Sequence, residues 1–231
     1  MTRALAAFDF DGTLSSRDNV LAYLRIVAGT RDLARAIAAV APALLAARRD
    51  PSQRDVAKAV VLRRTLAGRR EDYLRDLGAR YARLVVLEHL HSDVVARLDA
   101  HRAAGHDLVL VSASLRLYLD PIAELLEVPN VLATAMEVAP DGRLTGELAG
   151  ANVRGPEKAR RLDEWIAQSP RSPARRQQDA QDGETAAGGE DGGVVVYAYG
   201  DSDGDRELLA RADHPIRVDR YGRLPYWTPE R

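Results

Sequence analysis

Two aspartates one residue apart follow the first apolar segment of the chain, and this pattern constrains the fold more than any other. The segment Ala4–Phe8 is continuously apolar, as is typical of a strand covered on both faces of a parallel sheet. Asp9 and Asp11 come next, and would share a face at the carboxyl end of that strand, where α/β sheets place their sites. Carboxylates this close repel unless a cation lies between them or one is protonated. They indicate a Mg²⁺ site with a nucleophile and an acid/base partner.

The same stretch on its own is equally typical of a strand that ends in an Asp-Gly turn. Gly12 follows Asp11 directly, and glycine allows the chain to turn sharply at that point. The rest of the chain has to distinguish these two interpretations.

Composition limits the classes of protein that the chain can represent. With 231 residues, of which 46% are hydrophobic, the chain can form one large domain or a core with an insertion. The balance of 33 basic and 34 acidic residues argues against a nucleic-acid binder with a simple basic patch. The lack of cysteine excludes disulfides and thiolate metal sites. Together with a start that lacks the pattern of a signal peptide, this predicts a cytoplasmic protein.

A helical block is predicted between residues 18 and 90, because apolar residues recur there at helical spacing. Within it, Ala36–Ala47 is an apolar run of 12 residues, which is too short to span a bilayer. It predicts a buried or partner-covered helix that is kinked at Pro42. The alternative is contact with a membrane surface or a lipid substrate.

Helices and strands alternate over the second half of the chain, which predicts a doubly wound α/β fold with a parallel sheet. The predicted strands cover residues 107–111, 194–199 and 216–218, with a hairpin over 131–148; the predicted helices cover 92–103, 115–126, 156–168 and 205–212. Residues 169–193 hold no large apolar side chain. We expect them to form a disordered insertion, because such a composition cannot bury enough surface to offset the entropy of ordering.

Polar residues gather at the ends of these predicted elements. Ser112 follows one strand, Lys158 opens a helix, and Asp201 and Asp205 follow another strand. A phosphoryl group needs hydrogen-bond donors, a fixed positive charge and a cation, and these residues supply the donor, the charge and the oxygen ligands. Each also has a simpler interpretation: a helix N-cap for Ser112, a solvated helix residue for Lys158, and a turn, cap or calcium loop for the aspartates.

All four clusters occur in the order of a known family. The chain resembles haloacid dehalogenase superfamily phosphatases, of the phosphoserine-phosphatase-like subclass IB whose helical cap is inserted after the first strand. The heptapeptide FDFDGTL at residues 8–14 is similar to the first motif, Ser112 to the second, Lys158 to the third, and the hexapeptide GDSDGD at 200–205 to the fourth. The resemblance implies a Rossmann-like core over residues 1–15 and 91–231, with a helical cap over residues 16–90.

The resemblance also implies a role for each matching residue. Asp9 would attack phosphorus, and Asp11 would protonate the leaving oxygen and then activate water. Mg²⁺ would be bound by Asp9, the backbone carbonyl of Asp11, and Asp201. Asp205 would complete the cation shell or hold Lys158. The phosphoryl group would be held by Ser112, the amide of Ala113 and Lys158.

Two departures from phosphoserine phosphatases limit the prediction of the substrate. The second motif continues with Ala113 and Ser114 instead of two glycines. In the cap, Asp18 stands where the family has a substrate-binding carboxylate, but no arginine falls convincingly at the position of its partner. The other lysine of the chain, Lys58, matches no motif.

The sequence therefore predicts a Mg²⁺-dependent phosphomonoester hydrolase that works through an aspartyl-phosphate. Its expected partner is a small phosphorylated metabolite such as phosphoserine. No nucleic-acid partner is expected. One alternative is a lipid phosphate phosphatase of the phosphatidylglycerophosphatase kind, which the apolar run Ala36–Ala47 suggests. The other is a catalytically idle protein that only binds phosphate.

Overall fold

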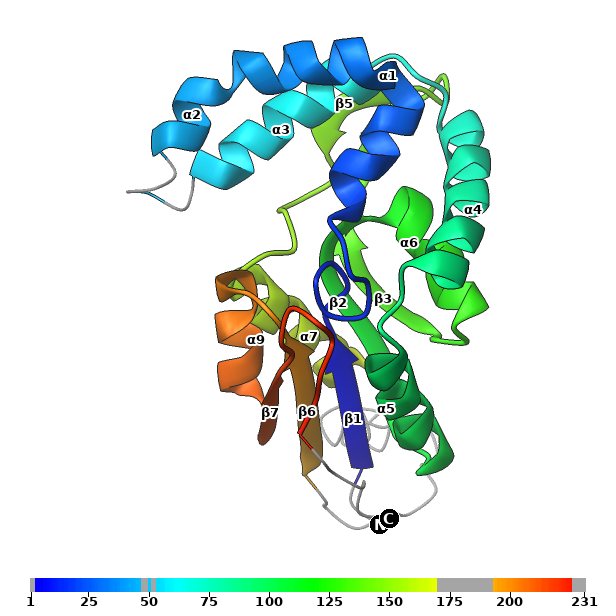
Figure 1. The fold of residues 1–231 in the computed structure, drawn as a ribbon, viewed down its shortest axis with the longest axis vertical. Helices are drawn as coiled ribbons and strands as arrows, with labels where there is room; N and C mark the ends of the chain where they lie inside the picture. The colour runs from blue at the N-terminus through cyan, green and yellow to red at the C-terminus, as the bar shows by residue number, and fades with distance from the viewer. Residues whose placement is uncertain (1–2, 47–49, 51–52, 170–192, 226–231) are drawn as a thin grey trace, which may run out of the picture. The chain divides into compact units, whose positions relative to one another are not determined.

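A computed structural model describes residues 3–46, 50, 53–169 and 193–225. These residues belong to two compact units (Figure 1). The first unit consists of Met1–Ser16, His91–Ser112 and Val153–Arg231, and the second of Arg17–Leu90 and Ala113–Asn152. The predicted insertion at 169–193 lies outside the described residues except at its two ends.

The main sheet is parallel at its centre, as the sequence predicts for a doubly wound α/β fold. Its strand order is β3-β2-β1-β6-β7, with β1 pairing in parallel with β2 and β6, and β6 with β7. The strands are β1 (Arg3–Phe8), β2 (Asp107–Leu115), β3 (Asn130–Thr134), β6 (Val194–Gly200) and β7 (His214–Arg217). In this register Phe8 lies beside Leu110 on one side and Tyr199 on the other.

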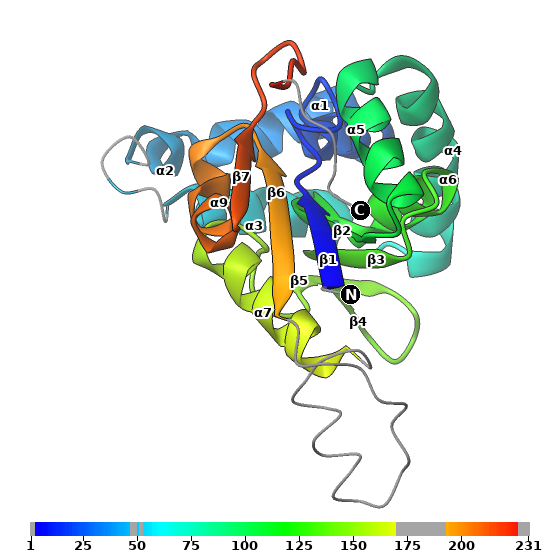
Figure 2. The same cartoon turned by 90° about the horizontal axis from the view of Figure 1, so that it is seen from below.

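The central strands of the first unit are apolar because helices cover both of their faces. Figure 2 shows α5 (Ser92–Ala103) on one face of the sheet, and α7 (Pro156–Gln168) with α9 (Arg206–Arg211) on the other. These helices bury Leu98, Leu162 and Leu208. In β1, Leu5 and Phe8 are both 0% exposed.

The second unit is mainly helical. It contains α1 (Asn19–Ala39), α2 (Ala41–Ala46), α3 (Gln53–Leu66), α4 (Glu71–Glu88) and α6 (Arg116–Leu125), with β3 and the hairpin β4 (Met136–Val138) and β5 (Leu144–Leu148). Its core includes the rings of Tyr23, Tyr81 and Tyr118, whose centroids lie 5.1–5.8 Å apart. Helix α4 approaches α6 closely at Gly78, where a Cβ would lie only 1.9 Å from the carbonyl oxygen of Leu117.

The apolar run Ala36–Ala47 is divided between two helices. Helix α1 ends at Ala39, and Pro42 lies in the first turn of α2, where its missing N–H leaves no hydrogen bond unmade. Ala36 and Val40 are buried, whereas Leu45 is exposed. Over the part of the chain that the structure describes, no helix combines the length and apolarity needed to cross a membrane.

Candidate active site

Three of the predicted site residues of the first unit lie at one edge of the sheet: two follow the ends of β1 and β6, and Ser112 lies inside the neighbouring strand β2. Asp9 comes directly after β1, and its backbone N–H donates to the carbonyl oxygen of Tyr199 at 2.9 Å. Because Phe8 is level with Leu110 and Tyr199, Ser112 and Asp201 each lie two residues beyond that level. The parallel register thus brings three segments, separated by about a hundred residues each in the sequence, to one edge of the sheet.

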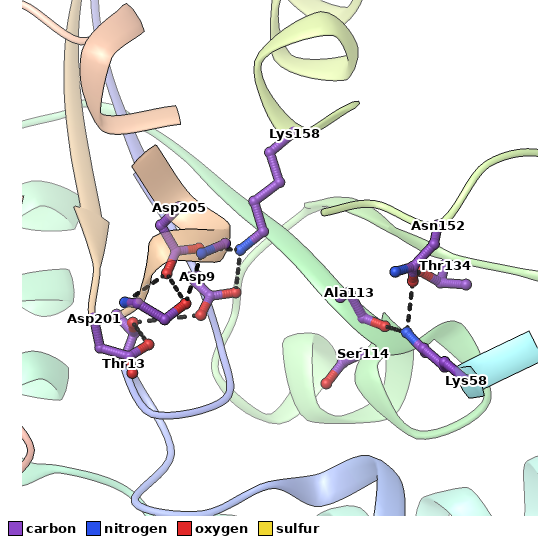
Figure 3. Close-up of polar contacts among 12 residues, drawn as sticks. Asp9, Thr13, Lys58, Ala113, Ser114, Thr134, Asn152, Lys158, Asp201 and Asp205 are labelled. Carbon is purple, nitrogen blue, oxygen red and sulfur yellow. Dashed lines mark hydrogen bonds and ion pairs between the residues drawn. The ribbon is translucent and has the colours of Figure 1, made fainter. Parts of the chain in front are cut away.

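Lys158 places a buried positive charge between two carboxylates (Figure 3). Its side chain is 3% exposed, and its Nζ donates to Asp9 Oδ1 at 2.5 Å and to Asp205 Oδ1. The lysine lies in the first turn of α7, which begins with Pro156 after Gly155. The N–H of Gly155 donates to the carbonyl oxygen of Gly204 at 2.9 Å, which ties the start of α7 to the loop that carries Asp205.

Asp205 is held from two sides. It ends the short 3₁₀ helix η1 (Asp203–Asp205), where it forms a capping box with Ser202. Its Oδ2 accepts from the Ser202 backbone N–H at 3.0 Å and from the Ser202 hydroxyl at 2.8 Å. Since Oδ1 is bound by Lys158, both oxygens of this carboxylate have protein donors.

Thr13 connects the other two carboxylates. Its hydroxyl lies 3.4 Å from Asp9 Oδ2 and 3.2 Å from Asp201 Oδ1. The preceding residue, Gly12, has φ +83°, and a Cβ there would lie 2.4 Å from Asp201 Oδ2. Glycine is therefore required at position 12, both for the backbone conformation and for the space that Asp201 occupies.

Burial and charge act against each other in this cluster. Burial raises the pKa of the Asp9 carboxyl to about 7, against the opposing influence of the Lys158 ammonium. Burial also raises the pKa of Asp201. Burial alone would raise the pKa of Asp205, but the nearby ammonium and the Ser202 donors hold it below its ordinary value. For Lys158, the two carboxylates outweigh burial and raise its pKa, so it carries its charge at neutral pH.

The donor set fits a hard cation. Asp9, Asp201 and Asp205 each present a carboxylate oxygen, and these oxygens lie within 4.8 Å of one another. Carboxylate oxygens are the ligands that Mg²⁺ prefers. Because burial disfavours the ionised forms of Asp9 and Asp201, a divalent cation beside them would supply the charge that their ionisation requires.

The remaining predicted residues have different surroundings. Asp11 is half-buried in the loop after β1, opposite Ser15. Ser112 is buried within β2 and is not a helix N-cap. In the second unit, Asp18 is exposed and caps α1, because its Oδ1 accepts from the Leu21 N–H at 3.1 Å. The Ala113 carbonyl oxygen, also in the second unit, accepts from Lys58 Nζ at 2.5 Å.

Three contributors were missed in the sequence. Thr13 lies inside the first motif, where a hydroxyl beside two aspartates could have indicated a hydrogen bond to them. Ser202 stands three residues before Asp205, the spacing of a capping box. The contact of Lys58 with Ala113 joins residues 55 positions apart, and no local pattern in the sequence indicates it.

Comparison with known proteins places this arrangement in a family. The sequence model of the family of haloacid dehalogenase-like hydrolases matches residues 6–210. Protein CicA of Caulobacter vibrioides is 33% identical over 209 residues, which cover 90% of this chain and 83% of that protein. A crystal structure of a protein of unknown function from Bordetella pertussis is 25% identical, with a TM-score of 0.72 and coverage of 95% of this chain and 90% of that one.

The fold is also similar to that of a substrate-bound phosphoserine phosphatase, with a TM-score of 0.58 at 16% identity, over 95% of this chain and 86% of that one. The family model covers most of the sequence, including all four motifs. The fold class and the resemblance expected from the motifs are thereby confirmed. The chain belongs to the haloacid dehalogenase-like hydrolase family, and its structural neighbours include phosphoserine phosphatase.

Proposed function

We propose that the protein is a Mg²⁺-dependent phosphomonoester hydrolase that works through an aspartyl-phosphate on Asp9. The observation that carries this proposal is the buried ammonium of Lys158, which lies against Asp9 and Asp205. Phosphoryl transfer depends on fixed charge that faces the transferring oxygens in a site shielded from water. A nucleophilic carboxylate beside a fixed cation meets that requirement, and the family is one of hydrolases.

Asp9, the backbone carbonyl of Asp11, and Asp201 would hold the Mg²⁺ ion. When bound, the ion would neutralise negative charge on the phosphoryl oxygens and on the carboxylates around it. Its support is the close approach of the Asp9 and Asp201 oxygens, with the Thr13 hydroxyl between them.

The proposed reaction has two halves. In the first, an oxygen of Asp9 bonds to phosphorus, the ester P–O bond breaks, and Asp11 gives its proton to the leaving alcohol oxygen. In the second, Asp11 takes a proton from water, the water oxygen bonds to phosphorus, and the P–O bond to Asp9 breaks. One water is consumed, an alcohol and phosphate are released, and both aspartates return to their starting state. Ser112, the Ala113 amide and Lys158 would hold the phosphoryl oxygens.

The proposed substrate class is a small phosphorylated metabolite, with phosphoserine as the first candidate. The similarity in fold to phosphoserine phosphatase supports it. Asp18 is proposed to contact the substrate with its Oδ2, since its Oδ1 caps helix α1. A phosphatidylglycerophosphate-type lipid is the competing outcome of the same assay, because the apolar run Ala36–Ala47 leaves Leu45 exposed.

The test is phosphate release from a panel of phosphomonoesters with Mg²⁺, combined with intact-protein mass spectrometry after rapid acid quench. The panel comprises phosphoserine, sugar phosphates, nucleotides, phosphatidylglycerophosphate and an aryl phosphate. Asp9→Asn should abolish turnover and labelling, because a carboxamide is a poor nucleophile. With the aryl phosphate, Asp11→Asn should accumulate one phosphoryl group per chain, since hydrolysis loses a contribution of about a hundred- to ten-thousandfold. Labelled Asp9→Asn, or normal turnover by Asp11→Asn, would show that the roles are wrong.

A further inference from the structure

A second polar network is built around Lys58, a residue to which the reaction proposed above gives no role. It lies entirely within the second unit and appears on the right of Figure 3. Lys58 Nζ donates to the Ala113 carbonyl oxygen at 2.5 Å and to Asn152 Oδ1 at 2.6 Å. Asn152 Nδ2 donates to Asp55 Oδ1 at 2.7 Å, and the Thr134 hydroxyl donates to Asn152 Oδ1 at 2.9 Å.

These contacts fix the orientation of the Asn152 amide. Its oxygen faces two donors, the ammonium of Lys58 and the hydroxyl of Thr134, and its nitrogen faces the carboxylate of Asp55. A flipped amide would place its NH₂ group against the ammonium and its oxygen against the carboxylate, and would lose both charge-assisted bonds. Asp55 and Lys58 lie three residues apart on α3, so that one face of the helix presents both charges.

The two residues that Lys58 contacts stand at two of the points where the chain passes between the units. Ala113 directly follows Ser112, the last residue of its segment of the first unit. Asn152 directly precedes Val153, where the chain returns to the first unit toward Lys158. Lys58 thus connects two crossing points of the chain. One directly follows Ser112, and the other begins the segment that leads to Lys158; both Ser112 and Lys158 are proposed to bind phosphate.

We infer that Lys58 is a positioning residue for the phosphate-binding segment Ser112–Ala113, an inference that rests on the proposed function. A hydrogen bond to the Ala113 carbonyl restrains the backbone dihedral angles of Ala113, and these set the direction of its N–H and of the preceding serine. Lysine suits this place because its compact ammonium can donate to two acceptors that belong to distant parts of the chain. Asp55 and Thr134 act through Asn152, which presents its oxygen to that ammonium.

The inference differs from two simpler roles for Lys58. A purely structural brace would change the stability of the fold without changing the affinity of the folded protein for a phosphate mimic. A direct contact with the organic part of the substrate would change KM for one substrate and leave binding of the mimic intact. Orthovanadate separates these roles, because it resembles the transferring phosphoryl group and has no organic part.

The experiment compares Lys58→Met and Lys58→Arg with the control Arg54→Met, which removes an exposed positive charge from the same helix. Lys58→Met should lower kcat/KM for the best panel substrate by about 10- to 100-fold, as expected when a supporting group lets a reacting group shift. Orthovanadate affinity, measured by calorimetry with Mg²⁺, should fall by a similar factor. Lys58→Arg, which keeps the donors, should recover most of the loss, and Arg54→Met should match the parent.

Calorimetry requires no turnover, so the inference is tested even if the parent hydrolyses none of the panel, which would refute the proposed function alone. Folded Lys58→Met with parental vanadate affinity would overturn the inference, whether or not KM for one substrate rises. If Lys58→Met does not fold, Thr134→Val replaces it, since it removes only the hydroxyl that donates to Asn152. We then expect a smaller loss of vanadate affinity, of about threefold, and parental affinity would again overturn the inference.

Discussion

Replacing Lys158 tests the electrostatic account of the site most directly. Lys158, Asp9 and Asp205 are 2%, 5% and 1% exposed, so Lys158→Met leaves two carboxylates in a buried place without their cation. Removing one partner of a buried ion pair costs about 3–5 kcal/mol, because the remaining charge is left uncompensated. With EDTA present, we therefore expect Lys158→Met to lose about 3–5 kcal/mol of unfolding free energy, a large share of the about 5–15 kcal/mol of a typical domain.

A second substitution separates this charge effect from simple loss of packing. In the parent, Asp205→Asn removes one of the two carboxylates that hold Lys158 and should destabilise the fold. In the Lys158→Met background, the same substitution removes a carboxylate that has lost its cation, and should cost little or increase stability. The double-mutant cycle should give a coupling energy of about 1–3 kcal/mol between the two positions.

The assay is urea unfolding at neutral pH in EDTA, followed by far-UV circular dichroism and tryptophan fluorescence, with Trp165 on α7 as a local reporter. Lys58→Met provides the matched control, since the Lys58 ammonium donates to two neutral oxygens, and its loss should cost about 1–3 kcal/mol of unfolding free energy. Turnover should likewise suffer much more from Lys158→Met than from Lys58→Met. Additive losses in the double-mutant cycle would refute the reasoning, because they would mean that Lys158 and Asp205 do not interact.

Two further substitutions test the surroundings of the site. Gly12→Ala should destabilise the protein by at least about 1 kcal/mol and weaken Mg²⁺-dependent thermal stabilisation, because a Cβ at φ +83° meets Asp201 Oδ2 at 2.4 Å; an unchanged melting temperature with and without Mg²⁺ would contradict this. His101 is buried between Tyr199 and His106, and burial lowers its pKa to about 3. Its contribution to stability is therefore complete above pH about 6.5 and is lost as the pH falls from there toward about 3, with a slope of up to about 1.4 kcal/mol per pH unit. His101→Gln should remove this part of the acid dependence of urea unfolding, and an unchanged slope would refute the assignment.

The sequence predicts the central strands well because their signal is local. Ala4–Phe8 and Val194–Tyr199 are continuous apolar runs, and both are central strands. The end of β2 is harder to predict. Serine is typical of turns, so the predicted strand ends at Val111, but the observed strand continues to Leu115 and buries both Ser112 and Ser114. The predicted hairpin over 131–148 is confirmed only for β4 and β5, since β3 joins the main sheet. Which strand a segment pairs with depends on partners far away in the sequence.

The site follows the same division between local and distant information. The carboxyl ends of parallel strands meet at one edge, and this rule alone predicts that Asp9 and Asp201 lie close together. The hydrogen bonds from Lys58 to Ala113 and Asn152, and from Asn152 to Asp55, join residues 55 to 97 positions apart. They depend on which side chains the folded helices bring together, so no spacing in the sequence could have indicated them.

The geometry bears on the two roles that the motifs leave open for Asp205. Oδ1 accepts from Lys158, and Oδ2 accepts from the backbone and hydroxyl of Ser202. A carboxylate oxygen can accept more than one partner, so the role of Asp205 as a cation ligand stays a prediction. A cation bound by Asp205 would have to share oxygens that already accept from protein donors. Asp201 Oδ1 accepts from the neutral Thr13 hydroxyl at 3.2 Å, and that hydroxyl also lies near Asp9. One O–H cannot satisfy both carboxylates, and burial raises the pKa of each. The deficit of positive charge therefore lies between Asp9 and Asp201, whereas Asp205 serves to keep Lys158 charged and in place.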